Sequence, residues 1–512
     1  MPYTVSRSLS KATALAMAAT LLLTSCTAVT NDESSPSATE PSTVLDANLP
    51  AELADYYTQS VKWEACGSTL ECATVEVPLN YAKPDGERIE LTLNRRKAQN
   101  AKGNLLVNPG GPGGSGLTLV SQSATSMFTP ELQRSYNLIG FDPRGVGESS
   151  PITCQSDAEK DDSRQSNLHA WDPADREQIV AEGKKYAQDC AQHTGELLGH
   201  VDTISAARDM DIIRALLGDR QLDYLGFSYG TFLGATYADL FPQRAGRLVL
   251  DGAMDPALSE EEVTLGQAKG FEDSIDAWLT DCLEYEDCPF SGTLDEAKTE
   301  LRDFFSRLEG TPMTSSDGRQ VPVVDFVTGF IVPLYDNSSW PLLRTAMQRA
   351  MNGDVDGILF FADLSNERTE EGKYLSNSMD AFTAINCLDR PMDASEAAME
   401  KQAQRLSEAS PTIGKYLAYG AIGCDTWSYE PTGKPANLSA TGAGPILVVG
   451  TTGDPATPYA WAQSLAKQLD NARLLTFEGE GHTAYGRGSD CINEAVDNYL
   501  LEGTLPAEGT RC

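Results

Sequence analysis

One serine in the chain stands in a sequence context that favours nucleophilic catalysis. Ser228 lies at the centre of Gly226-Phe-Ser-Tyr-Gly230, a G-x-S-x-G motif that follows a short apolar run and opens a helical pattern. A serine on such a sharp strand-to-helix turn needs small neighbours two positions away on either side. Its hydroxyl attacks a carbonyl only when a general base, usually histidine, takes its proton. The motif therefore predicts acyl-transfer chemistry at Ser228.

The base and its orienting acid are expected downstream of the serine. Of the four histidines, only His482 follows Ser228, just after the apolar run 473–476, whereas His169, His193 and His200 precede it in polar stretches. Asp454 comes directly after the run 446–449. A carboxylate there would hold the imidazole in the tautomer that accepts the serine proton. Ser228, Asp454 and His482 are the predicted catalytic residues.

Acyl transfer also needs two N–H groups that bind the oxyanion of the tetrahedral intermediate. Tyr229 follows the nucleophile and should supply one. The other is expected from the loop 108–116, which reads NPGGPGGSG, with Gly110 and Gly111 as the candidates. A phosphate-binding role is not supported, because the loop lacks the Gly-Lys-Ser/Thr ending. No cofactor is expected.

The elements that must carry these residues are short apolar strands and intervening helices. Continuous apolar runs of this kind are typical of a buried parallel sheet. Strands are predicted at 73–81, 88–93, 104–107, 136–139, 222–225, 247–250, 446–449 and 473–476, and helices at 203–217 and 229–240. The fold class is α/β, with a mostly parallel central sheet and flanking helices.

Residues 257–436 interrupt this alternation with mostly helical patterns, such as 294–308 and 394–406. We interpret them as a large cap inserted between two parts of the core, 47–256 and 437–512. The cap holds 32 Asp and Glu against 14 Lys and Arg, a net charge of −18. Two interpretations stay open for this acidity: a solvated surface, or a part in ligand binding.

The N-terminus is typical of an exported protein. Residues 1–25 carry two cations and an apolar run of 12, which fits a secretory signal peptide and is too short to span a bilayer. The segment ends Leu23-Thr-Ser-Cys26, like a bacterial lipobox, so Cys26 is the predicted lipidation site; an ordinary signal peptide with an incidental cysteine is the alternative. Residues 26–46, rich in Ser, Thr and Pro, should form a flexible tether.

Ten further cysteines support export, since an even number is typical of disulfides made outside a reducing cytosol. No metal site is predicted, because no CxxC occurs and the histidines do not cluster with cysteines. Short separation favours Cys66–Cys72 and Cys282–Cys288. Sequential pairing of the rest would give Cys154–Cys190, Cys387–Cys424 and Cys491–Cys512.

Composition limits the classes of partner. The 512 residues are 41% hydrophobic and carry a formal net charge of −35. Nucleic-acid binding is not expected, because affinity for phosphate backbones comes mostly from Lys and Arg. After residue 25 no apolar run is long enough to cross a bilayer, so contact with a membrane should be through the lipid anchor alone.

Six motifs taken together resemble one enzyme family. They are GGPGG at 110–114, GFDPRGVGES at 140–149, GFSYG at 226–230, LDGAMDP at 250–256, GDPATP at 453–458 and GHT at 481–483. The chain is similar to the proline iminopeptidases and tripeptidyl aminopeptidases, serine peptidases of the α/β-hydrolase fold, and most of all to the secreted bacterial tripeptidyl aminopeptidase-like proteins. One departure is Pro109, where the iminopeptidases carry histidine.

The resemblance implies a cell-surface serine exopeptidase that releases short peptides, tripeptides above all, from free N-termini. Its partner would be a peptide or protein with a free N-terminus, and a monomer is favoured. Cap carboxylates would suit the substrate ammonium. Asp389, beside Cys387, is the candidate, with a plain surface role as its alternative. An envelope esterase or lipid hydrolase with the same triad is the rival function, and a non-catalytic binding lipoprotein is the third. The protein is expected on the outer face of the cell membrane, or released from it.

The motif at 140–149 is expected to have a structural role. Asp142 and Arg144 should brace the loops around the oxyanion glycines.

Overall fold

The computed structural model describes residues 49–512, through which runs a nine-stranded sheet in the order β1-β2-β3-β5-β4-β6-β7-β10-β11. Its strands are β1 (Glu64–Ala65), β2 (Leu70–Pro78), β3 (Arg88–Arg96), β4 (Gly103–Asn108), β5 (Tyr136–Phe141), β6 (Leu222–Phe227), β7 (Ala245–Asp251), β10 (Ile446–Gly453) and β11 (Ala472–Glu480). The pairs from β1 to β3 and between β3 and β5 are antiparallel, and all the others are parallel. The predicted mostly parallel sheet is confirmed; the two-residue strand β1 was not predicted.

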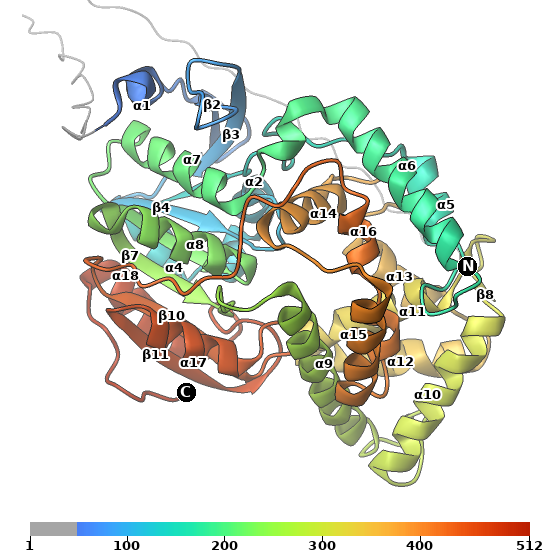
Figure 1. The fold of residues 1–512 in the computed structure, drawn as a ribbon. Coiled ribbons are helices and arrows are strands. Elements are labelled where there is room, and N and C mark those ends of the chain that lie inside the picture. The colour runs from blue at the N-terminus through green and yellow to red at the C-terminus, as the bar shows by residue number, and fades with distance from the viewer. Residues whose placement is uncertain (1–48) are drawn as a thin grey trace, which may run out of the picture. The chain divides into compact units, whose positions relative to one another are not determined.

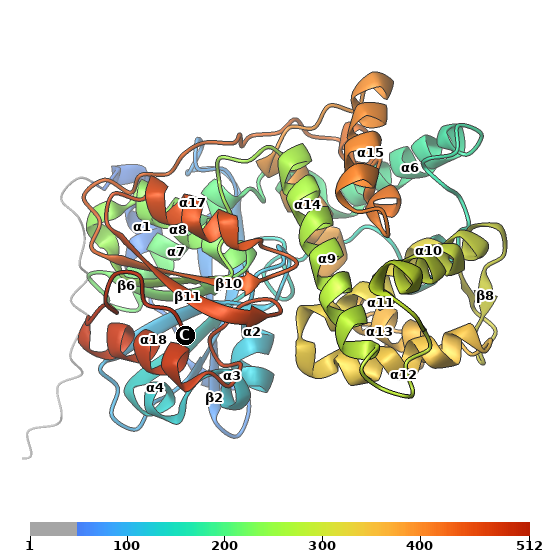
Figure 2. The ribbon, with the colours of Figure 1, turned by 90° about the horizontal axis from the view of Figure 1, so that it is seen from below.

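Helices cover both faces of the sheet (Figures 1 and 2). One face carries α1 (Ala54–Thr58), α7 (Thr203–Leu216), α8 (Tyr229–Leu240) and α17 (Tyr459–Gln468). The other face carries α2 (Gly116–Thr118), α3 (Ala124–Met127), α4 (Pro130–Ser135) and α18 (Asp490–Glu502). In β7, Leu248 and Leu250 belong to the first apolar layer, and Val249 between them belongs to the second. Because successive side chains point to opposite faces, a strand buried on both sides must be apolar throughout.

The cap lies between β7 and β10 in the chain and is largely helical. It contains α9 (Glu260–Cys282), α10 (Leu294–Gly310), α11 (Val323–Ile331), α12 (Trp340–Met351), α13 (Asp356–Ser365), α14 (Ser378–Asp389), α15 (Glu396–Ala409), α16 (Ala421–Asp425) and a small hairpin of β8 (Met313–Thr314) and β9 (Gln320–Val321). The cap has an apolar core of its own, which includes Trp278, Phe305 and Phe330. Amphipathic helices need such a shared interior, because most helical stability comes from packing an apolar face.

A second segment of the chain packs against the cap, and it comes from the part predicted as core, 47–256. Helices α5 (Asp157–Arg164) and α6 (Arg176–Thr194) lie beside the cap helices in Figure 1. Arg164 pairs with Asp325 of α11 at 2.9 Å and with Asp363 of α13 at 2.7 Å. The cap is therefore built from two stretches of chain that are far apart in sequence.

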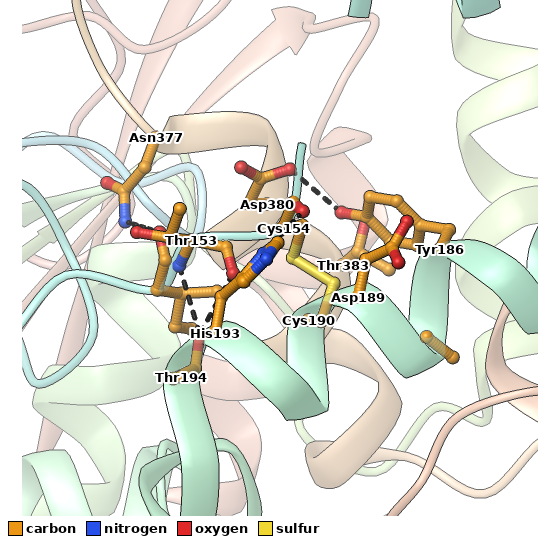
Figure 3. The surroundings of a disulfide bond; sticks show 12 residues. Thr153, Cys154, Tyr186, Asp189, Cys190, His193, Thr194, Asn377, Asp380 and Thr383 are labelled. Carbon is orange, nitrogen blue, oxygen red and sulfur yellow. Dashed lines mark hydrogen bonds between the residues drawn. A yellow bond between two sulfur atoms is a disulfide. The ribbon is translucent and has the colours of Figure 1, made fainter. Parts of the chain in front are cut away.

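The Cys154–Cys190 disulfide anchors this second segment (Figure 3). Tyr186, one turn earlier on α6, donates a hydrogen bond to Asp380 of α14 at 2.9 Å. Asn377, just before α14, donates to the carbonyl of Ile152 at 2.9 Å. The same region thus joins α6, the loop after β5 and the start of α14.

All five predicted disulfides are present in the structure: Cys66–Cys72, Cys154–Cys190, Cys282–Cys288, Cys387–Cys424 and Cys491–Cys512. Between residues 49 and 512, none of the helices combines the length and the apolar composition that a bilayer crossing requires. The predicted signal peptide 1–25, Cys26 and the tether 26–46 lie outside the described residues.

The order of the strands determines where a ligand can bind. From β4 the chain crosses outward to β5 and then returns to β6, so β4 and β6 are neighbours at the point where the strand order reverses. In open α/β sheets, ligands bind outside the carboxyl ends of the strands at such a point. The loop 108–116 and Ser228 both lie at these strand ends.

Candidate active site

Ser228 lies on a strained turn between β6 and α8. Its φ of 55° and ψ of −123° are rare for a residue with a side chain, and such strain is typical of functional positions. Its backbone N–H donates to the carbonyl of Asp251 at 2.9 Å. A Cβ at Gly226 would lie 2.4 Å from the carbonyl oxygen of Gly230, and a Cβ at Gly230 would lie 2.8 Å from Asn108 Oδ1. The two glycines of the motif are required because the backbone passes that closely.

Asp454 and His482 meet at the ends of β10 and β11. His482 Nδ1 lies 2.9 Å from Oδ1 and 3.0 Å from Oδ2 of Asp454. The carboxylate is buried and also accepts the backbone N–H groups of Ala456 at 2.9 Å and Thr457 at 2.8 Å. These bonds fix the carboxylate, and the carboxylate fixes the imidazole ring. The geometry is that of an orienting acid and a general base.

The oxyanion loop, residues 108–116, approaches the nucleophile at Gly110. A Cβ on Gly110 would lie 2.5 Å from the carbonyl of Phe227 and 2.9 Å from Ser228 Cβ. The N–H of Gly110 already donates to Asn108 Oδ1 at 2.9 Å. Gly110 therefore shapes the loop and cannot be the donor we predicted.

Gly111 and Tyr229 are the better pair of oxyanion donors. Across residues 49–512, no acceptor is found for the N–H of Gly111. Tyr229 is the first residue of α8, and N–H groups in the first turn of a helix have no partner within it. Tyr229 N would lie 3.2 Å from a Cβ on Gly110, so this N–H is close to the loop.

Asp142 and Arg144 were both expected to brace the oxyanion loop, but only Asp142 does so. Asp142 accepts the hydroxyl of Ser115 at 2.6 Å and the N–H of Glu148 at 2.9 Å, so it does support the end of the oxyanion loop. Arg144 is fully buried and pairs with Asp209 of α7 at 2.7 Å. It stabilises the core behind the site rather than the glycines.

Asp251 is a site residue that the sequence argument missed. It ends β7 and is fully buried. Its side chain accepts the N–H groups of Ala484 and Tyr485 at 3.0 and 2.8 Å, while its carbonyl holds Ser228. Burial raises its pKa to about 6, although the two N–H bonds oppose the shift. One residue thus connects the nucleophile turn to the histidine loop. A polar residue directly after a buried parallel strand was the signal that could have revealed it.

Tyr335, from the cap, is the second residue that was missed. Its carbonyl accepts the N–H of His482 at 2.8 Å, and its ring meets the imidazole edge-on, with 5.5 Å between centroids. Nothing in the local sequence pattern distinguishes it. Within residues 49–512, no hydrogen bond joins Ser228 to His482, and such bonds often tighten only when substrate is bound.

Asp389 does not face a substrate. Its side chain is buried, with residue exposure of 4%, and both oxygens bind Thr203, at 2.8 Å to the N–H and 2.6 Å to the hydroxyl. Thr203 Oγ1 in turn lies 2.5 Å from the hydroxyl of Tyr229. The predicted amine-binding role is therefore wrong, because Asp389 is occupied within the core. Instead it supports the residue that follows the nucleophile.

Burial gives Asp389 a measurable effect on stability, because it raises the pKa of the carboxyl to about 7. An unfolded Asp titrates near pH ~4. Between these values the folded protein holds a proton that the unfolded chain releases, so stability falls as the pH rises through this window. From pH 4.5 to 7.5 we expect the native chain to lose on the order of 1–3 kcal/mol more than Asp389→Asn in urea denaturation.

Asp425→Asn, at the exposed end of α16, is the control for removing one negative charge. Parallel stability profiles for the native chain and Asp389→Asn would contradict this prediction.

Sequence comparison agrees with this geometry. A family model described as TAP-like protein matches residues 410–512, which carry β10, β11, Asp454 and His482. Serine protease Hip1 of Mycobacterium tuberculosis (strain ATCC 25618 / H37Rv) is 36% identical over 479 residues, 89% of this chain and 91% of that protein. Carboxylesterase B of the same strain is 38% identical, with 87% and 86% covered. Tripeptidyl aminopeptidase of Streptomyces coelicolor is 31% identical, with 88% and 86% covered.

These relatives match nearly the whole chain, cap included, and not the core alone. The chain therefore belongs to the tripeptidyl aminopeptidase-like family of α/β-hydrolases, and it is a serine hydrolase.

Proposed function

We propose that the protein is an exported serine aminopeptidase that releases short peptides, tripeptides in particular, from free N-termini. The disulfides are of the kind that form outside a reducing compartment, which supports export. On this proposal, a lipid on Cys26 holds the enzyme at the outer face of the membrane. Two relatives carry the names of a serine protease and of a tripeptidyl aminopeptidase.

The observation that carries the proposal is a cavity on the far side of the start of α14, the helix that contacts the oxyanion loop. A cavity of about 580 Å³ lies between α9, α14, α15 and α16, and Phe382 is part of its lining. The backbone N of Phe382 would lie 3.2 Å from a Cβ on Gly113 of the oxyanion loop. A pocket of this volume is in the range that small ligands occupy. It suits the amino-terminal residues of a peptide whose scissile carbonyl is at Ser228.

Glu260 is the carboxylate in this cavity that an ammonium would satisfy. It begins α9, and its Oε2 is buried with no hydrogen-bond partner within the described chain. Arg390 Nη1 forms an ion pair with it at 3.6 Å, a separation too long for a hydrogen bond. Burial raises the pKa of Glu260. A buried carboxylate oxygen without a hydrogen bond is costly, and a substrate ammonium would supply the missing hydrogen bonds. Glu261, by contrast, has an ion pair with Arg405 that is also hydrogen-bonded.

The chemistry then follows from the positions of the core residues. Ser228 Oγ attacks the scissile carbonyl while His482 takes its proton, and Asp454 stabilises the imidazolium. The N–H groups of Gly111 and Tyr229 receive the oxyanion. His482 returns the proton to the leaving amine, and water then releases the peptide from the acyl-enzyme by the same steps. The cap would determine which end of a peptide enters.

Glu260→Gln tests the amine site. With Ala-Ala-Ala linked to a fluorogenic amine, we expect KM to rise about 10- to 100-fold, because a charged hydrogen bond is lost, and kcat to change little. The same substrate with an acetylated N-terminus should be cleaved poorly by the native enzyme and no worse by the variant. Initial-rate kinetics on both substrates measures the difference.

Glu262→Gln is the matched control. Glu262 is exposed, and glutamine preserves its capping-box contact with Ser259. Equal cleavage of free and acetylated peptides by the native enzyme would contradict the aminopeptidase proposal. Equal KM values for Glu260→Gln and Glu262→Gln would contradict the role of Glu260 alone.

An ester hydrolase is the second candidate, and it has observations of its own. Carboxylesterase B is among the relatives, and two apolar side chains of α14 are exposed near the oxyanion loop: Met379 at 46% and Phe382 at 42%. An acyl chain would pack against such a surface. Turnover of short-chain esters without any turnover of free peptides would favour this function over the first.

A further inference from the structure

The loop that carries His482 has little regular structure of its own. It connects β11 to α18, and two of its residues, Gly481 and Thr483, have φ of 105° and 65°. A loop without ladder or helix bonds takes its conformation from its neighbours. The orientation of the imidazole therefore depends on whatever contacts the residues around 482.

The core fixes only part of this loop. Asp454 fixes the Nδ1 side of the imidazole, and Asp251 fixes the backbone after the histidine at Ala484 and Tyr485. Neither Asp454 nor Asp251 binds the backbone N–H of His482 or packs against its ring.

The cap supplies the contacts that the core leaves out. Tyr335 belongs to the short helix Val332–Tyr335, whose Leu334 is fully buried in the apolar core of the cap. The carbonyl of Tyr335 accepts the N–H of His482 at 2.8 Å, and its ring packs edge-on against the imidazole at 86°. Phe271 of α9 also packs against the tyrosine ring, with 5.5 Å between centroids. His482 is thus in direct contact with the interior of the cap.

Arg487 makes a second connection. Its guanidinium donates to the carbonyls of His482 and Thr483 at 3.3 and 3.2 Å. On its other side it pairs with the carboxylate of Asp336, the next cap residue, at 3.0 Å. A planar guanidinium with several fixed donors can hold two partners in a defined geometry. Asp336 also accepts the N–H of Ser338 at 3.0 Å, which fixes its own position.

We propose that Tyr335 and Asp336 are positioning residues for the general base, and that the cap is a structural part of the catalytic centre. The inference rests on serine hydrolase chemistry and not on the choice between peptides and esters. Proton transfer needs His482 Nε2 within hydrogen-bond reach of Ser228 Oγ, and a misplacement of about 1 Å can cost about 100-fold in rate. A cap that moved away from the core would take the contacts at 335 and 336 with it, and the base would lose its alignment.

Asp336→Asn tests the proposal. Asparagine Oδ1 can still accept the N–H of Ser338, so the local turn is preserved, while the negative charge that holds the Arg487 guanidinium is lost. We expect kcat to fall about 10-fold for a short-chain nitrophenyl ester, which is too small to need the cap, with KM unchanged. Labelling of Ser228 by a fluorophosphonate should slow by a similar factor, and Asp336→Glu should recover most of the loss.

Asp354→Asn is the matched control, because Asp354 forms an exposed ion pair with Arg349 elsewhere on the cap. It should leave ester turnover and labelling at the native level. Native ester kinetics in Asp336→Asn would overturn the proposal, because Asp336 would then have no effect on the general base. A rise in KM for peptides alone would also overturn it, because the segment would then act on substrate binding. The melting temperature of each variant, compared with that of the native enzyme, tests whether it is folded. Ester turnover by the native enzyme makes this test independent of whether peptides are the substrate.

Discussion

Replacing Ser228 by alanine is expected to lower kcat by about 10⁴- to 10⁶-fold on every substrate that the native enzyme turns over. The variant loses the only group placed to form the acyl-enzyme at the end of β6, while the oxyanion donors remain. Alanine keeps the Cβ of serine, so the backbone strain at φ 55° is unchanged and the turn should stay folded. What survives is the rate that binding and the oxyanion hole supply to attack by water.

A fluorophosphonate probe measures this result directly. It should label the native protein at one serine, identified by peptide mass spectrometry, and should fail to label Ser228→Ala. Ser407→Ala, on the exposed face of α15, is the control and should label normally. Labelling that persists in Ser228→Ala would mean that another residue is the nucleophile.

Gly110→Ala should have the second largest effect, and its cause is steric. The new Cβ would lie 2.5 Å from the carbonyl of Phe227 and 2.9 Å from Ser228 Cβ, distances at which backbone has to move. Displacing the oxyanion loop removes Gly111 from the developing charge. Loss of one oxyanion donor costs about 10²- to 10³-fold in kcat. Initial rates with a saturating ester substrate would measure the loss.

Gly218→Ala separates the clash from the backbone penalty. Gly218 also has a positive φ, 80°, but a Cβ there meets nothing within 4 Å. In both variants alanine must adopt the left-handed conformation, which lowers stability by about 1 kcal/mol. Only Gly110→Ala should also lose activity. Equal activity in the two variants would show that the oxyanion loop can relax around the extra methyl group.

The sheet and the nucleophile turn could be predicted because local rules determine them. A strand buried on both faces has to be an apolar run, so 222–225 and 446–449 were recognisable without any tertiary information. The turn at Ser228 leaves no room for side chains at Gly226 and Gly230, so glycine is required at both positions and the motif can be recognised in the sequence. Asp454 and His482 then followed from their place after strands.

Several of the errors concern the cap and its contacts. Asp389 has the right residue type for an ammonium site, but whether a helix end faces solvent or Thr203 depends on packing, which periodicity does not report. Tyr335 acts largely through its backbone carbonyl, and every residue type has one. The segment α5–α6 lies between core strands in sequence, yet its arginine and aspartate side chains face the cap.

The pairing of β7 with β10 has a consequence for how the enzyme is made. Residues 252–445 separate these neighbouring strands, so β7 and β10 can pair only after the whole insertion has been synthesised. Long-range pairings of this kind slow folding, and chains emerge N-terminus first. The nucleophile on β6 therefore exists before its acid and its base, which arrive with β10 and β11. A partly made chain carries Ser228 without the groups that activate it, and hydrolytic activity begins only when the last two strands have docked.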